Sequence, residues 1–116
     1  MSYALYSSSD SGLPDGTVNF GGADVSVLAT SPLPSNTWTH LALTYDGTTL
    51  RIFVNGSLAS AQPANGLLAT AGTPLRIGGD SIWGEYFSGL IDEVRIYNRP
   101  LTANEIQVDM GTPIVP

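Results

Sequence analysis

The sequence predicts an all-β sandwich or jelly roll with one short helix near the C-terminus. Three observations favour this class. Short apolar or alternating segments recur along the chain, turn residues separate them, and a helical pattern occurs once, at 102–110. The 116 residues are enough for one domain. We place this domain at residues 1–110 and interpret 111–116 as a linker or tail.

The predicted strands are short and differ in the strength of their signal. They are expected at residues 3–8, 17–20, 24–29, 38–45, 50–54, 58–61, 75–77 and 90–98. The first of them alternates only weakly and is expected at a sheet edge. Pro32 and Pro34 put a loop at 31–36, because proline withholds the hydrogen-bond donor that a ladder needs.

The middle of the chain carries the strongest pattern. Residues 50–54 alternate, with Leu50, Ile52 and Val54 on one face, and Asn55-Gly56 follows at once. This dipeptide predicts a two-residue hairpin turn, because both of its central residues adopt positive φ. Trp38, at the start of the preceding strand, is expected to be an anchor of the core rather than a platform for sugar stacking.

The C-terminal part predicts a last strand and a helix. In residues 90–98 one face holds Leu90, Asp92, Val94 and Ile96, and the other holds the residues between them. Thr102 and Glu105 have the spacing of a capping box, in which a threonine hydroxyl and a glutamate satisfy amide donors at the start of a helix.

Composition excludes several partners. The net charge is −6, with four arginines and no lysine, so the chain lacks the basic surface that nucleic acid or an anionic membrane requires. No apolar run is long enough to span a bilayer, and the N-terminus lacks the pattern of a signal peptide. Cysteine is absent, which excludes disulfides and thiolate metal sites.

Three segments in this order are similar to the laminin-G-like domains of the concanavalin A-like lectin/glucanase superfamily. Residues 36–47 are NTWTHLALTYDG, residues 50–56 are LRIFVNG and residues 87–99 are FSGLIDEVRIYNR. The LRIG at 75–78 and the LTANEI at 101–106 fit the same pattern. The resemblance implies an extracellular β-sandwich with a binding role. Family members begin with further strands, so we expect an incomplete sandwich that corresponds to the C-terminal part of such a domain.

One loop is a candidate ligand site. Asp80, Trp83, Glu85 and Tyr86 combine two carboxyl groups with two aromatic rings, which suits sugar binding. In the alternative interpretation, Trp83 and Tyr86 fold back and cap the core, since large aromatic side chains are usually buried.

Asp92 and His40 are the other candidates for a special role. The carboxyl of Asp92 lies on an apolar face and needs a partner. The resemblance implies a structural Ca²⁺ there, and the alternative is a hydrogen bond to backbone amides or to an arginine. His40 has no neighbouring serine, cysteine or second histidine, so we interpret it as a structural residue with satisfied hydrogen bonds.

These features lead to three functional hypotheses. The first is a non-catalytic glycan-binding or adhesive module from a larger extracellular protein. The second, a glycosidase, is rejected, because Glu85, Glu93 and Glu105 do not form the alternating acidic run of the superfamily's glucanases. The third is an assembly domain without a glycan ligand, which completes its sandwich as a homodimer or other homo-oligomer.

Overall fold

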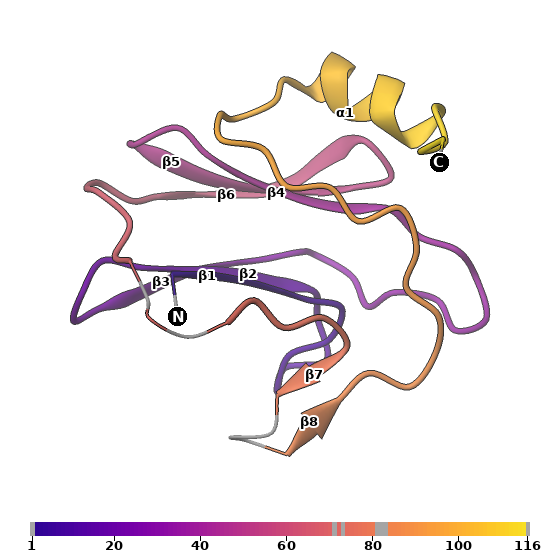
Figure 1. The fold of residues 1–116 in the computed structure, drawn as a ribbon, viewed down its shortest axis with the longest axis horizontal. Coiled ribbons are helices and arrows are strands. Elements are labelled where there is room, and N and C mark those ends of the chain that lie inside the picture. Colours follow the sequence, from indigo (N-terminus) through magenta and orange to yellow (C-terminus); the bar gives the residue numbers. More distant parts are fainter. Residues whose placement is uncertain (1, 71, 73, 81–83, 116) are drawn as a thin grey trace.

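The computed structural model describes residues 2–70, 72, 74–80 and 84–115, and all structural statements concern these residues. They form two three-stranded antiparallel sheets, a two-stranded hairpin and one helix. The two sheets lie face to face, and the helix α1 covers the outer side of one of them (Figure 1). The fold is therefore a partial β-sandwich, as the sequence predicts.

The first sheet consists of β1 (Tyr3–Tyr6), β2 (Asp15–Asn19) and β3 (Asp24–Leu28), in that order. Each strand pairs antiparallel with the strand that is next to it in the sequence. A tight turn joins β2 to β3, in which Phe20 N donates to Ala23 O at 3.0 Å and Gly21 has a φ of 90°. The predicted edge position of the first strand is confirmed, because within the described ranges β1 pairs only with β2.

The second sheet consists of β4 (Leu41–Tyr45), β5 (Thr49–Val54) and β6 (Ser57–Pro63). The predicted hairpin turn between β5 and β6 is confirmed. Asn55 and Gly56 have φ values of 50° and 78°, and Val54 pairs with Ser57 across them. Asp46 closes the turn between β4 and β5, because its carboxylate accepts hydrogen bonds from the backbone N–H groups of Thr48 and Thr49.

The core lies between the two sheets. Strands β2 and β3 pack against β5 and β6. Val18 and Val27 come from the first sheet, Leu50 and Ile52 from the second, and all four side chains are buried. Burying one such side chain contributes about 1.5–3 kcal/mol, so this small cluster supplies much of the stability. Phe53 is buried on the opposite face of β5.

Helix α1 (Ala103–Met110) begins with the predicted capping box. Thr102 is the N-cap, and its hydroxyl accepts a hydrogen bond from Glu105 N at 3.2 Å. The Glu105 carboxylate accepts one from Thr102 N at 3.1 Å. Ile106 is the buried residue of the helix, and the Gln107 side chain donates to Gly56 O, which attaches α1 to the β5–β6 turn.

Two predicted strands are wrong. Residues 75–77 and 90–98 contain no strand, and the short hairpin of β7 (Gly79–Asp80) and β8 (Glu85–Tyr86) lies between them. Both segments have strand-like sequences, but no described segment forms a ladder with either. A strand needs a hydrogen-bonded neighbour as well as a suitable sequence, so both segments are irregular.

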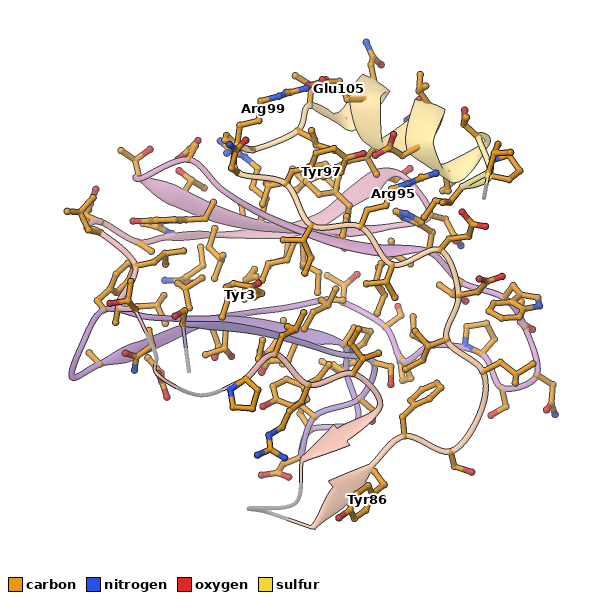
Figure 2. The ribbon with its side chains drawn as sticks, viewed as in Figure 1. Tyr3, Tyr86, Arg95, Tyr97, Arg99 and Glu105 are labelled. Carbon is orange, nitrogen blue, oxygen red and sulfur yellow. The ribbon has the colours of Figure 1, made fainter. Side chains whose placement is uncertain are left out.

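One side of the sandwich is open. Tyr3 pairs with Val18 of the core, and Leu5 pairs with Gly16, where an added Cβ would collide with Leu43 of β4. The side chains of Tyr3 and Leu5 therefore face the second sheet, and Figure 2 shows Tyr3 between the two sheets. They are nevertheless 45% and 43% exposed. Strands β1 and β4, each at the edge of its sheet, border this side.

Candidate functional site

The hairpin of β7 and β8 carries the candidate ligand residues. Asp80 pairs with Glu85 and Gly79 with Tyr86, so the fold brings the backbones of the two acidic residues opposite each other. Tyr86 is 71% exposed, and the hypothesis that it caps the core is therefore wrong. Trp83 lies outside the described residues.

Segment 90–99 still presents polar residues on one side and apolar residues on the other, although it forms no hydrogen-bonded ladder with any described strand. Glu93, Arg95, Tyr97 and Arg99 contact helix α1 or the tail. The apolar residues of the opposite face are exposed to solvent. They are Leu90, Val94 and Ile96. The polar face thus holds the helix, and the apolar face has no cover among the described residues.

Arg95 joins the segment to the C-terminal end of α1. Its guanidinium donates to Asp109 O at 2.6 Å and also to Thr112 O. Tyr97 Oη donates to Asp109 Oδ2 at 2.6 Å, and this hydrogen bond to a carboxylate raises the pKa of the tyrosine. Glu93 accepts from Ile114 N at 2.7 Å. Figure 2 shows Arg95 and Tyr97 below the helix.

Arg99 and Glu105 form a two-pronged ion pair at the start of α1. The guanidinium donates to Oε1 at 3.0 Å and to Oε2 at 2.5 Å. The arginine, together with the amide of Thr102, lowers the pKa of Glu105 to about 2. The sequence pattern predicted the capping role of Glu105 but not this pairing, which depends on the path of residues 99–102.

His40 lies close enough to Arg95 and Asp109 to feel their charges, and its hydrogen-bonding groups are only partly satisfied. Its backbone N donates to Asn55 Oδ1 at 2.9 Å, and its carbonyl accepts from Asn55 N at 2.8 Å. Its Nδ1 is buried without a hydrogen-bond partner among the described residues, which corrects the prediction of a satisfied histidine. Burial, followed by the charge of Arg95, lowers the pKa of His40.

Trp38 does not belong to the core. It is 66% exposed and precedes β4, so its predicted role as an anchor is wrong. The β5 partner of Leu41 is Val54, the last residue of that strand, and residues 38–40 extend beyond the ladder. Without an opposing strand, the tryptophan has no sheet surface to cover.

Asp92 is exposed, and its Oδ1 accepts a hydrogen bond from Glu93 N at 2.8 Å. One carboxylate supplies at most two of the six to eight oxygens that Ca²⁺ requires. No group of three acidic, histidine or cysteine side chains suited to a metal occurs in the described part of the chain. Any calcium at Asp92 would therefore be held mainly by carbonyl oxygens and water.

Comparison with known proteins agrees with this architecture. A family profile described as the concanavalin A-like lectin/glucanases superfamily, of the laminin G type, matches residues 2–107. No curated protein sequence matches the chain. Within the described ranges, no helix is long and apolar enough to cross a membrane.

A solved structure has a similar fold. It is the S-layer domain-containing protein (residues 221–444) from Clostridium thermocellum ATCC 27405, with a TM-score of 0.54 and 23% sequence identity. The match covers 84% of this chain and 51% of that one, so the chain spans about half the length of its structural neighbour. With the profile match over nearly all of its length, this chain belongs to the concanavalin A-like lectin/glucanases superfamily.

Proposed function

We propose that this chain is a non-catalytic, carbohydrate-binding or adhesive module that acts outside the cell as part of a larger protein. The exposed ring of Tyr86, on a hairpin that pairs Asp80 with Glu85, is the observation that carries the proposal. A sugar ring stacks on an aromatic face, and neighbouring carboxylates accept hydrogen bonds from its hydroxyl groups. The family and the S-layer neighbour support an extracellular location.

The ionised state of Glu105 supports a binding role rather than catalysis. A glycosidase needs two nearby carboxyl groups, one of which keeps its proton near neutral pH. The pKa of Glu105 is about 2, and Glu93 accepts a hydrogen bond from the tail. Glu105 is therefore not suited to donate a proton to a leaving group.

Pull-down on a panel of insoluble polysaccharides tests the glycan proposal. We expect the wild type to bind at least one of them, Tyr86→Ala to lose about tenfold or more in affinity, and Tyr86→Phe to retain it, because the ring face supplies the stacking. Val108→Ala, an exposed change on α1, is the matched control. Equal binding by Tyr86→Ala and the wild type would remove this hairpin from the proposal.

Calcium at Asp92 is a second part of the proposal, and it follows from the family resemblance. Bound calcium would raise the melting temperature according to its free concentration. We expect EDTA to lower the melting temperature of the wild type and to leave Asp92→Asn unchanged. A wild-type melting curve that responds to neither EDTA nor added calcium would show that the metal has no place here.

The open side of the sandwich favours a second candidate function, assembly through homodimerisation. Tyr3 and Leu5 face inward but are exposed, and the apolar face of segment 90–96 has no cover among the described residues. Neither β1 nor β4 contains a charge or a proline that would protect an exposed edge. A second copy, related by a two-fold axis, would continue both sheets and cover these side chains.

A further inference from the structure

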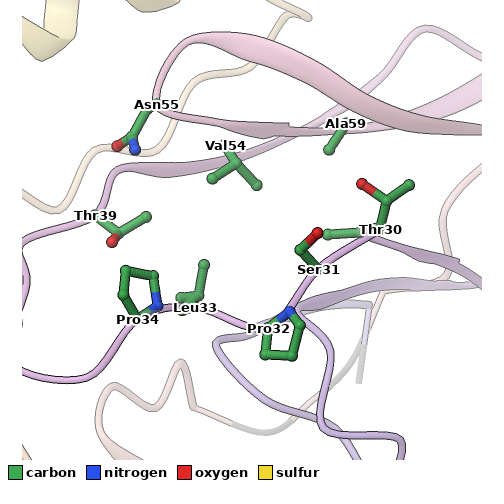
Figure 3. Close-up of a pocket in the computed structure, with 10 residues that line it drawn as sticks. Thr30, Ser31, Pro32, Leu33, Pro34, Thr39, Val54, Asn55 and Ala59 are labelled. Carbon is green, nitrogen blue, oxygen red and sulfur yellow. The ribbon is translucent and has the colours of Figure 1, made fainter.

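A pocket lies at the end of the sandwich where β3 and β5 end. The loop that follows β3 forms one wall, and the end of β5, its turn and β6 form the other (Figure 3). The volume is about 240 Å³. This is smaller than the pockets of roughly 300–1,000 Å³ that hold drug-sized ligands, and it suits a single ring.

The walls of the pocket are fixed by local structure. Pro32 and Pro34 restrict the backbone of the loop. Asn55 is held in its turn by two hydrogen bonds with the backbone of His40. Ala29 N donates to Pro14 O at 2.9 Å, which fixes the start of the loop on the first sheet. The pocket is therefore preformed and needs little ordering when a ligand binds.

The lining is polar but uncharged. Ala29, Leu33, Val54 and Ala59 supply apolar surface. The hydroxyl groups of Thr30 and Ser31 and the side-chain N–H groups of Asn55 have no protein partner in the described part of the chain. Such a lining offers hydrogen bonds of both kinds together with apolar contact. A neutral sugar ring has this combination, with hydroxyl groups at its edge and C–H groups on its face.

The exposed Trp38 belongs to the same loop. It is the residue before Thr39, which lines the pocket. Its exposed aromatic ring offers a face on which a second sugar unit can stack.

We propose that the pocket between residues 29–34 and the β5–β6 turn binds one uncharged sugar unit, with Trp38 as the platform for the next unit. The inference rests on the proposed carbohydrate function but names a site different from the Tyr86 hairpin. Because the lining contains no charged residue, we assign the pocket to neutral rather than acidic sugars.

Amide NMR of the full chain tests the pocket with methyl glycosides of neutral hexoses and pentoses, and with glucuronic acid as the charged comparison. We expect at least one neutral glycoside to shift the amides of Thr30, Ser31, Thr39 and Asn55 and to saturate in the millimolar range, as a few hydrogen bonds imply. Glucuronic acid should leave these amides unshifted. A disaccharide should bind more tightly than its single unit, and Trp38→Ala should remove that difference.

Two variants make the result specific. Ser31→Leu fills the pocket from an exposed loop position and should abolish the shifts, and Thr30→Val removes one hydroxyl at nearly constant shape and should weaken binding by roughly three- to tenfold. A melting temperature equal to that of the wild type shows that each variant is folded. Tyr86→Ala should leave the shifts unchanged.

The outcomes separate this inference from the proposed function. Polysaccharide binding through Tyr86 without pocket shifts overturns the pocket alone. Pocket shifts without polysaccharide binding overturn the Tyr86 site alone. Equal shifts with glucuronic acid, or shifts that survive Ser31→Leu, also contradict a neutral-sugar site in this pocket.

Discussion

Gly56 couples the β5–β6 turn to helix α1. Its φ of 78° is unfavourable for a side chain, and an added Cβ would lie 2.7 Å from Gln107 Cγ and 3.7 Å from Met110 Sδ. At Gly47 the φ is 95°, but an added Cβ meets nothing within 4 Å. A side chain at Gly47 would cause backbone strain alone, whereas a side chain at Gly56 would also displace the helix.

Replacing each glycine by valine in a separate variant measures the cost of backbone strain and the cost of displacing the helix. We expect Gly47→Val to lower the free energy of unfolding by about 1–2 kcal/mol through strain alone. Gly56→Val should lower it further, because Gln107 must move and its hydrogen bond to Gly56 O is lost. Urea unfolding provides the measurement. An unchanged Gly56→Val would contradict the turn, and equal losses would contradict its contact with the helix.

Individual residues also show where sequence patterns mislead. Asn55-Gly56 and the Thr102–Glu105 box were predictable, because each depends on groups within four residues. The exposure of Trp38 was not, because it depends on β5 ending at Val54, opposite Leu41. The pocket beside that loop was missed for the same reason, since its walls come from segments distant in the sequence.

At the scale of elements, α1 depends on the charge of Glu105. The folded pKa is about 2 and the ordinary value is 4.5, so its stabilising contribution is present above pH 4.5 and is lost as the pH falls towards 2. Glu105→Gln keeps an oxygen for the amide of Thr102 but removes the ion pair with Arg99. The variant therefore tests the charge of Glu105 while keeping the hydrogen bond to the amide of Thr102.

We expect Glu105→Gln to melt below the wild type at pH 6 and to approach it as the pH falls through 4.5 towards 2. Added salt should reduce the difference at pH 6, because the ion pair is exposed to solvent. Thermal unfolding followed by circular dichroism provides the measurement. A difference that stays constant over this pH range would show that the ion pair does not stabilise the helix.

Segment 90–98 illustrates what an alternating sequence determines and what it does not. The alternation correctly divides the segment into two faces, because Glu93, Arg95 and Tyr97 all contact α1 or the tail. It does not determine whether a ladder forms, since this requires a neighbouring strand. The face of Asp92, Val94 and Ile96 was expected to be buried and is exposed.

For the whole molecule, the sandwich architecture was predictable, because turns and alternating strands both indicate it, and its open side followed from the family resemblance. Two strand edges border that side, and the apolar face of residues 90–96 is exposed as well. An exposed surface of this kind favours association. The net charge of −6 causes two copies to repel each other over most of their surface. Strands β1 and β4 contain no charged residue, so this repulsion does not act directly at their edges.

A dimer formed through the open side predicts the mass of the protein in solution. Light scattering at micromolar concentration should give twice the chain mass of 12.1 kDa. Ile96→Glu should shift the equilibrium to monomer by roughly 2 kcal/mol or more, because the dimer would bury a carboxylate. Val108→Glu is the matched control, since Ile96 and Val108 are similarly exposed, at 58% and 65%, and Val108 lies on α1. A monodisperse wild-type monomer, or equal dissociation by both variants, would contradict the dimer, whereas selective dissociation by Ile96→Glu would place the interface on the open side.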